Sequence, residues 1–550
     1  MASDESPPCL LLALPDPCML AVLQCCAADQ RTLFCAARAH SRLHKAAVLA
    51  LRSITAVLTD QQQADDMCMY LTKHGQNLDR IHLKATRDEV SIRQLPATLR
   101  LHSLVCENIC VQLQPGEGFQ GVLGLAALKQ LQLRRCELLP TGADEGLEVA
   151  LSQLPAGFEH LSISMIHFGN VWSQASLNSG ALQQLHQLTY LDLTYLNLKR
   201  PSQGEPALQA LKSLPKLARL RLTSNSIDII DASVFAGMRS LTWLELSGFI
   251  LESDGLSGST QLQHLALQDA FHAHDILDSG AVAVSQLMSQ LHYLQQLTHL
   301  SLSHSSTPNW EQETKATPAY SALTASSKLH RLEFSSCRLP SGVWQHMFPA
   351  GRQLPDLRVL DISGIREPTG WNAPAPDSSR LVSCCPALEH LDMRRLQYRT
   401  ELLAPLTELS GLRTLLVAAD DQEADTGLPA VCQLTGLREL YVWESSSAKH
   451  GLLLQLTQLQ QLTALTHIGP AREIAESGSD GDGMGDDDWM GDGMDEFAKL
   501  YDTVELICQV SLLWWLAHRG VALLCDAANF CHNSAQQVER IAMGENAFQI

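Results

Sequence analysis

Leucines recur in one short pattern along most of this 550-residue chain. The pattern is L-x-x-L-x-L, in which the last two leucines alternate with polar residues, so each copy predicts a short strand with one buried face. More leucines, spaced by three, precede many copies, as in ALQQLHQL before Leu188 and ALKSLPKL before Leu217. That spacing predicts a helix or a tight helical turn packed behind each strand.

The copies follow one another at intervals that vary from 21 to 35 residues. Twelve of them begin at residues 128, 158, 188, 217, 241, 262, 297, 329, 357, 388, 412 and 437, which is about 28 residues per repeat. One unit of this size cannot bury its leucines alone, so neighbouring units must stack. We therefore expect an α/β solenoid over residues 76–470, with a parallel strand ladder on its concave side and helical or irregular segments on its convex side.

This repeat resembles the leucine-rich-repeat family, whose members build curved solenoids from such units. The family commonly places Asn or Cys eight residues after the first leucine, where the side chain bonds to the neighbouring turn. Three copies have such a residue there: Cys136, Asn225 and Cys337. Apolar residues fill the position in other copies: Ile166, Leu196, Phe249 and Leu396.

A small all-α module is expected ahead of the repeats, over residues 9–50. Leu-Pro at the front begins a first helix, and Asp29 is a capping residue for a second one. The apolar positions of the two helices are Leu14, Pro15, Leu20, Val22, Leu23 and Leu33. Two short helices bury little between them, so the module needs another surface, either the first repeat or a partner protein.

These apolar positions, closed by Arg42 and followed by a solenoid, resemble an F-box. The family commonly has Trp where Leu43 stands and Val near Ala39, so the similarity is concentrated in the first half. The resemblance implies that six residues contact a Skp-type adaptor of a cullin complex: Leu14, Pro15, Leu20, Val22, Leu23 and Leu33. The alternative is a helical cap that shields the end of the solenoid.

An acidic segment separates the repeats from an apolar C-terminal stretch. Residues 473–496 hold ten acids and no Lys or Arg, which predicts a disordered linker over residues 471–497. It does not fit a calcium loop, because Met490 and Phe497 stand where oxygen ligands are needed. Residues 498–550 predict an apolar helical segment, whose run Leu506 to Ala517 is too short to span a bilayer. A disordered N-terminus over 1–8 and a helical connector over 51–75 complete the expected organisation.

Composition narrows the classes of function. A formal charge of −20 disfavours nucleic acid and anionic membrane surfaces as partners. The N-terminus has no basic residue before its apolar run, and two prolines interrupt that run, which argues against secretion and for a cytoplasmic or nuclear protein with reduced thiols. The sixteen cysteines show no zinc spacing, and nucleotide-binding, hydrolase and metalloprotease motifs are missing. The sequence therefore predicts no enzyme activity, no metal and no cofactor.

The residues between the leucines are expected to line the concave face, where Tyr, Trp and Arg are typical of binding hot spots. Neighbouring strands lie ~4.8 Å apart, so residues of consecutive repeats form a compact patch. The residues expected to bind a protein target are Tyr190, Asp192, Arg219, Arg221, Trp243 and Glu245, with Tyr441 and Trp443 near the far end. The histidines at 160, 264, 299 and 390 are interpreted as scattered surface residues.

Two hypotheses of different classes follow. The F-box resemblance implies the substrate receptor of an SCF-type cullin-RING ubiquitin ligase, which recruits targets through the repeats and acts by proximity. The alternative is a non-catalytic scaffold or adaptor, cytoskeletal or ciliary, with no ubiquitin link. Repeats followed by acids are also similar in layout to Ran GTPase-activating proteins and acidic nuclear phosphoproteins, which leaves small-GTPase regulation open.

Overall fold

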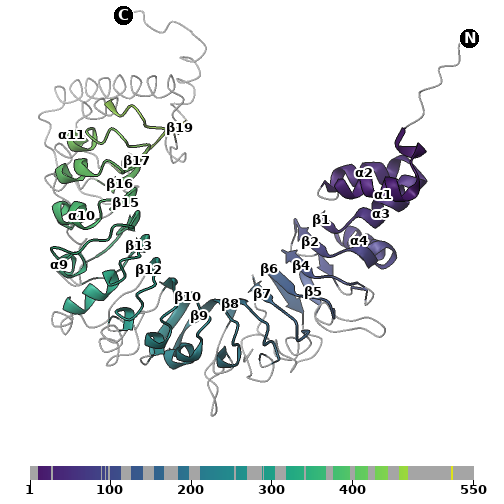
Figure 1. The fold of residues 1–550 in the computed structure, drawn as a ribbon, viewed down its shortest axis with the longest axis horizontal. Helices are drawn as coiled ribbons and strands as arrows, with labels where there is room; N and C mark the ends of the chain where they lie inside the picture. The colour runs from purple at the N-terminus through teal and green to yellow at the C-terminus, as the bar shows by residue number, and fades with distance from the viewer. Residues whose placement is uncertain are drawn as a thin grey trace, which may run out of the picture. The chain divides into compact units, whose positions relative to one another are not determined.

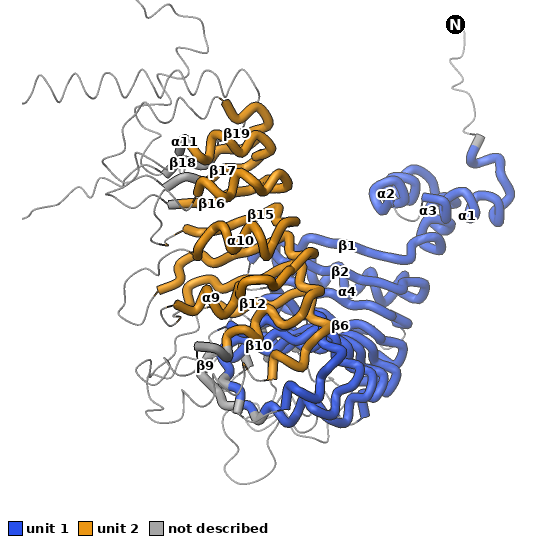
Figure 2. The backbone as a smooth tube through the Cα atoms, turned by 60° about the vertical axis from the view of Figure 1, so that its left-hand side comes forward, with its two compact units in different colours: residues 1–270 blue, residues 271–550 orange. Residues whose placement is uncertain are grey.

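The computed structural model divides the chain into two compact units, Met1–Ala270 and Phe271–Ile550 (Figure 2). In unit 1 it describes residues 10–26, 29–87, 90–92, 95–96, 99–112, 125–139, 154–165, 182, 184–196, 211–252 and 255–268. In unit 2 it describes residues 288, 290–303, 317–337, 339, 342–366, 376–394, 396, 403–418, 428–443, 458–468 and 522–523.

Unit 1 begins with a helical module. Its elements are η1 (Leu10–Ala13), α1 (Asp16–Cys25), α2 (Gln30–Ala39) and α3 (Ser41–Ala50). Asp29 caps α2 by accepting a hydrogen bond from the Thr32 amide at 3.2 Å, as the sequence predicts. Met19, Leu23 and Leu33 are buried among the helices, so the module has a small apolar core of its own.

A parallel ladder fills the rest of unit 1, with helical segments on one side of it (Figure 1). Its strands pair in the order β1 (Ser53–Leu58), β2 (Arg80–Ala85), β4 (Ser103–Glu107), β6 (Gln130–Leu139), β7 (His160–Met165), β8 (Tyr190–Leu196), β9 (Arg219–Asp231), β10 (Trp243–Glu252) and β11 (His264–Gln268). In a second row of short strands, β3 (Ser91–Ile92) pairs with β5 (Cys110–Gln112), which in turn pairs with the end of β6. The helical segments are α4 (Gln61–His74), η2 (Gly75–Asn77), η6 (Ala232–Gly237) and η7 (Gly255–Gly258).

The ladder starts earlier than the leucine pattern indicates. Strand β1 lies inside the stretch 51–75, for which the sequence predicts a helical connector, and only α4 and η2 of that stretch are helical. Ser53–Leu58 is a strand because it pairs along its whole length with β2, which supplies the hydrogen bonds that an isolated β-branched segment lacks.

Glutamine side chains close the strand edges at the start of unit 1. Gln30 of α2 donates through Nε2 to the Thr55 carbonyl at 2.8 Å and accepts from the Thr55 amide at 2.7 Å. Gln61 of α4 makes the same two bonds with Ser91 of β3, at 3.0 and 2.8 Å. Each side-chain amide takes the place of a neighbouring strand and satisfies backbone groups that an edge strand otherwise leaves unpaired.

Unit 2 repeats the same construction. Its strands pair in the order β12 (His299–Ser303), β13 (Arg331–Glu333), β14 (Val359–Asp361), β15 (His390–Asp392), β16 (Thr414–Ala418), β17 (Glu439–Trp443), β18 (Ala464–Ile468) and β19 (Ala522–Leu523). Helical segments alternate with them in sequence: η8 (Thr317–Thr324), α9 (Trp344–Met347), α10 (Ser378–Cys384), η10 (Ala404–Glu408) and α11 (Leu428–Val431).

Buried thiols tie successive repeats together in both units. Cys136 donates through Sγ to the Cys106 carbonyl at 3.2 Å, and Cys337 donates to the Leu302 carbonyl at 3.1 Å. Burial raises the pKa of the Cys136 thiol to about 11, so this thiol keeps the proton that it donates. The expectation that a thiol at this repeat position bonds to the neighbouring repeat is confirmed for both cysteines, while the side chain of Asn225 lies outside the described part.

The acidic linker and the apolar run Leu506 to Ala517 lie outside the described residues, as does the N-terminal stretch 1–8. Of residues 498–550 only Ala522–Leu523 are described, and they form a strand on β18. Among the helices of the described segments, none combines the length and the apolar character needed to cross a membrane.

Candidate functional site

Residues that alternate with the buried leucines form one open face of the unit 1 ladder. The register aligns Tyr190, Arg219 and Trp243 on β8, β9 and β10. It aligns Asp192, Arg221 and Glu245 in the next row of the same strands. Because leucine pairs with leucine at each step, the polar positions between them must also match. The sequence expectation that these six residues are neighbours is confirmed, and we call them the central patch.

In the first row of the central patch, a pair of stacked rings lies on each side of Arg219. His160 of β7 stacks on Tyr190, with ring centroids 4.0 Å apart and 5° between the planes. Trp243 stacks on His264 of β11, with centroids 4.7 Å apart and 18° between the planes. These two histidines are partly exposed on the open face, as expected of surface residues, but each is stacked on an aromatic ring instead of standing alone. The sequence signal was their position, since each lies in the same row as the aromatic residue of the adjacent repeat.

Charges in the second row of the central patch are paired within the protein. Arg221 Nε lies 3.1 Å from Glu245 Oε1. Asp192 is 7% exposed and accepts hydrogen bonds from Ser162 Oγ at 3.0 Å and Thr194 Oγ1 at 2.8 Å. Burial raises the pKa of Glu245, and the guanidinium of Arg221 opposes this shift. These groups position one another and leave little unused charge for a ligand.

Arg219 stands in contrast to Arg221. Its side chain is exposed, and the described part of the chain gives it neither a hydrogen bond nor an ion pair. A guanidinium in this state has five N–H donors available, in a fork that fits a carboxylate or a phosphate.

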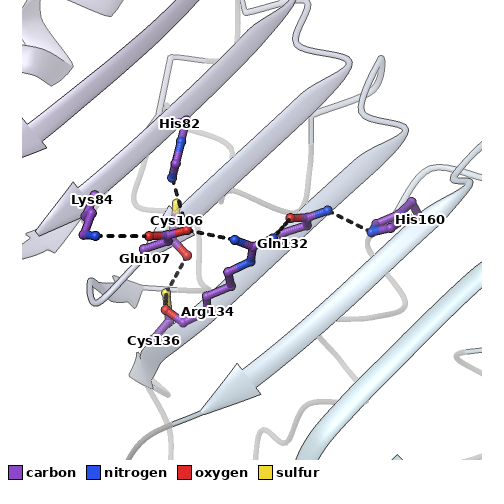
Figure 3. Close-up of polar contacts among 8 residues, drawn as sticks. All are labelled: His82, Lys84, Cys106, Glu107, Gln132, Arg134, Cys136 and His160. Carbon is purple, nitrogen blue, oxygen red and sulfur yellow. Dashed lines mark hydrogen bonds and ion pairs between the residues drawn. The ribbon is translucent and has the colours of Figure 1, made fainter. Parts of the chain in front are cut away.

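Glu107 of β4 is the centre of a polar network on the same open face (Figure 3). Its carboxylate lies 3.0 Å from Arg134 Nη1, 3.8 Å from Lys84 Nζ and 3.4 Å from His82 Nε2. These residues come from β2, β4 and β6, so the network links three neighbouring strands. These residues were not expected at a site, since His82, Lys84 and Glu107 stand before residue 128, where the leucine pattern is incomplete.

Gln132 connects this network to the first pair of rings (Figure 3). Its Oε1 accepts from Arg134 Nη2 at 3.0 Å, and its Nε2 lies 2.9 Å from His160 Nε2. Burial lowers the pKa of the His160 imidazole below the ordinary value of 6.5, although Asp192 acts in the opposite direction. The ring is therefore neutral at pH 7 and can accept a hydrogen bond from the Gln132 amide.

We expect His160 to titrate below pH 6.5 when its ring signals are followed by NMR. Replacing Tyr190 by alanine uncovers the ring, so the pKa of His160 is expected to rise toward 6.5. Protonation is disfavoured in the folded state, so the stability carried by the neutral ring is complete above about pH 6.5 and falls as the pH drops through the lowered pKa. His299, in unit 2, is the internal control, because its pKa is expected to be the same in both proteins. An unchanged pKa of His160 in the variant would contradict burial by Tyr190 as the cause.

Of the second expected cluster, Tyr441 and Trp443, the structure describes the side chain of Tyr441. Tyr441 of β17 lies under the guanidinium of Arg394, with 5.0 Å from Arg394 Cζ to the ring centroid. Arg394 also pairs with Asp392, which is 3% exposed, at 2.7 Å between Nη2 and Oδ2. This pair raises the pKa of Arg394. The side chain of Trp443 lies outside the described part, and Arg394, which sequence reasoning missed, is what holds Tyr441.

The residues expected to contact an adaptor differ in exposure. Val22 is 42% exposed, Pro15 is exposed, and Leu14 and Leu20 are half-buried. Leu23 and Leu33 are only 3% and 1% exposed and pack inside the helical module. Phe34, which the sequence analysis did not include in the set, is 37% exposed.

Arg42 fixes the start of the helical module. Its guanidinium donates to the carbonyls of Leu12 and Leu14, at 2.8 and 3.1 Å, and pairs with Asp16 at 2.6 Å. These bonds hold the segment that leads into α1 against α3. The position that closes the F-box-like stretch therefore orients the Leu14-Pro15 corner.

The described faces carry no grouped metal-ligating side chains. Within the ranges that the structure describes, no three His, Cys, Asp or Glu side chains are grouped so that they could hold a metal ion. The open face of unit 1 carries stacked rings, fixed hydrogen-bonding groups and a guanidinium that has no partner among the described residues.

Comparisons with known proteins give one family match and several similar solved structures. Residues 207–249 match the family model described as leucine rich repeat. An internalin (InlF) from Listeria monocytogenes is similar in structure at 17% identity and a TM-score of 0.39, over 65% of this chain and 85% of that one. Mouse RP105, in its complex with MD-1, is similar at 15% identity and a TM-score of 0.42, over 76% of each chain.

Scores of this size carry no argument about the function of the chain, and no curated protein matches its sequence. The family match covers β9 and the start of β10, and so includes Arg219, Arg221 and Trp243. The long parallel ladder and this match together show leucine-rich repeats in an α/β solenoid-like fold.

Proposed function

We propose that this chain is a protein-binding receptor that recruits a target through the open face of unit 1 and docks on a Skp-type adaptor through its helical module. In that role it is the substrate receptor of an SCF-type cullin-RING ubiquitin ligase. The chain supplies binding and position, while another subunit carries the ubiquitin chemistry. The proposal extends to a cytoplasmic or nuclear location, where such complexes act.

The observation that carries the adaptor part is the exposed apolar surface of the helical module. Val22 and Phe34 are 42% and 37% exposed although the module already has a buried core. Leu49 of α3 is a third such residue, at 48% exposed. Single exposed apolar residues are common, but three on one small module ahead of a binding solenoid favour a docking surface. Leu14, Pro15 and Leu20 lie close to Val22 in the sequence. Pro15 is exposed, and Leu14 and Leu20 are half-buried.

Replacing Val22 by aspartate is expected to abolish adaptor capture by the tagged chain, because a buried charge at an apolar contact costs far more than the contact contributes. Capture from cells, read by mass spectrometry and blotting for the adaptor and cullin, measures the effect. We expect at least a tenfold loss, since about 1.4 kcal/mol gives a factor of ten.

Val57→Asp is the matched control. Val57 is 56% exposed but lies on β1, outside the helical module, so the same change there is expected to leave adaptor capture intact. Leu23→Asp is a poor test, because Leu23 is 3% exposed and the variant would disrupt the module itself. Failure to recover any adaptor with the unaltered chain, or equal recovery with Val22→Asp, would reject the ligase role.

A second candidate is a scaffold with no ubiquitin link, in which the helical module only caps the ladder. The two bonds between Gln30 and Thr55 favour it, because they show α2 closing the edge of β1. One helical module can both cap β1 and dock on an adaptor, so the cap alone does not decide between the two candidates. Adaptor capture is the experiment that separates them.

A further inference from the structure

The central patch contains one cation, Arg219, that has no partner among the described residues. Arg221 is held by Glu245 at 3.1 Å, whereas Arg219, two residues earlier on the same strand, is exposed and unpaired within the described part of the chain. We propose that Arg219 and the two ring pairs beside it bind an extended acidic segment of a protein target, with Arg219 holding a carboxylate. This inference rests on the proposed role as a protein-binding receptor and names the chemistry of its target.

The charges around Arg219 are balanced in number, in a chain with a formal charge of −20. The central patch carries Arg219 and Arg221 against Asp192 and Glu245, while the cations of β2 and β6 lie at least three strands away. Neighbouring strands are ~4.8 Å apart and the Debye length is about 8 Å at physiological salt, so those distant cations are largely screened at Arg219. Asp192 accepts from neighbouring hydroxyls and Glu245 pairs with Arg221, so within the described part of the chain Arg219 is the cation of the patch that an anionic ligand can pair with.

The spacing of the row fits an extended peptide that crosses the strands. The five side chains come from consecutive strands β7 to β11, in the order His160, Tyr190, Arg219, Trp243 and His264. With strands ~4.8 Å apart, the middle of each ring pair lies about 7 Å from the strand of Arg219. In an extended peptide, residues i and i+2 point to the same side and lie about 6.7 Å apart.

These two similar spacings define which peptide sequence the row would recognise. An Asp or Glu at position i can place its carboxylate on the fork of Arg219, which binds carboxylates through two parallel hydrogen bonds. Aromatic or large apolar side chains at positions i−2 and i+2 then cover the His160–Tyr190 and Trp243–His264 pairs. Rings already stacked on each other lose little freedom on binding, so they are effective contact surfaces.

A nucleic acid fits this surface less well than an acidic peptide. Binding a phosphate backbone draws on a continuous track of cations. Here Asp192 and Glu245 lie in the row beside Arg219, and Glu107 interrupts the cations further along the face. Among the described residues, one guanidinium of the central patch lacks a partner, which suits a single acidic side chain better than a phosphate chain.

Fluorescence anisotropy with the full chain, in the absence of any adaptor, tests the proposal. The probe is a fluorescein-labelled peptide with three glutamates between two tyrosines, and its partner probe has three glutamines instead. We expect the glutamate peptide to bind about tenfold more tightly, and Arg219→Gln to remove this preference. Arg239→Gln is the matched control, because Arg239 is an exposed arginine of unit 1 outside the strands and its replacement changes the net charge equally.

Three results would each overturn the proposal. The first is equal affinity for the two peptides, and the second is an equal loss in Arg219→Gln and Arg239→Gln. The third is binding of a labelled oligothymidylate as tight as that of the glutamate peptide, which would indicate a general attraction for polyanions. Circular dichroism establishes that both variants are folded. Since no adaptor is present, failure of this test is distinct from failure of adaptor capture.

Discussion

Replacing Gly255 by alanine is expected to lower the free energy of unfolding of unit 1 by about 3 kcal/mol. Gly255 begins η7, which packs directly on η6, and a Cβ at this position would overlap the backbone of Ala232 and Ser233. Backbone atoms cannot turn away as a flexible side chain can, so the two helical turns must separate. Urea denaturation followed by circular dichroism measures the loss.

Gly237→Ala is the matched control for this prediction. Gly237 ends η6, and a Cβ added there meets nothing within 4 Å, so this variant is expected to stay within about 0.5 kcal/mol of the unaltered chain. Since β9 leads directly into η6, Gly255→Ala is also expected to disturb the strand that carries Arg219. Equal urea midpoints for the two variants would show that η6 and η7 do not pack as described.

Replacing Leu220 by alanine is expected to cost about 3–4 kcal/mol, because the site is fully enclosed and leaves a cavity. Leu220 is 0% exposed and lies between Leu191 and Leu244 in the ladder. Each repeat of a solenoid is stabilised mainly by its two neighbours, so a defect on β9 weakens the coupling between the repeats on either side. We therefore expect the urea transition of unit 1 to broaden or to split in two.

Arg219→Gln is the internal control for Leu220→Ala. The two residues are adjacent on β9 but face opposite sides, one into the core and one onto the open face. The arginine variant is expected to keep the stability of the unaltered chain and to lose peptide binding, and the leucine variant to lose stability. If Leu220→Ala unfolded at the same urea concentration as Arg219→Gln, the leucine would not be a core residue.

Alternating leucines made the ladder and its register predictable. A strand has a side-chain period of two, so a buried leucine at every second position fixes which residues share the other face. The alignment of Tyr190, Arg219 and Trp243 follows from the leucine positions alone, and the structure contains it. The bonds from Cys136 and Cys337 were predictable for the same reason, since their place in the repeat is fixed by the leucines.

Strand β1 and its cap were beyond the reach of the leucine pattern. Ser53–Leu58 has no full copy of L-x-x-L-x-L, and it is a strand because β2 pairs with it on one side and Gln30 on the other. Both partners are distant in the sequence. A pattern that is read within a window of a few residues contains no information about them.

The sequence by itself determined the α/β repeat, the order of the strands and which residues line the open face, because these depend on local alternation and on the need of each repeat for a neighbour. Only the tertiary structure decided how the side chains of the open face pair: His160 with Tyr190, Trp243 with His264, and Glu245 with Arg221. Arg219 is left without a partner among the described residues. Two arginines of one strand are equivalent in a pattern of residue types. They differ in the folded protein, because Arg221 lies within ion-pair distance of Glu245 on the adjacent strand.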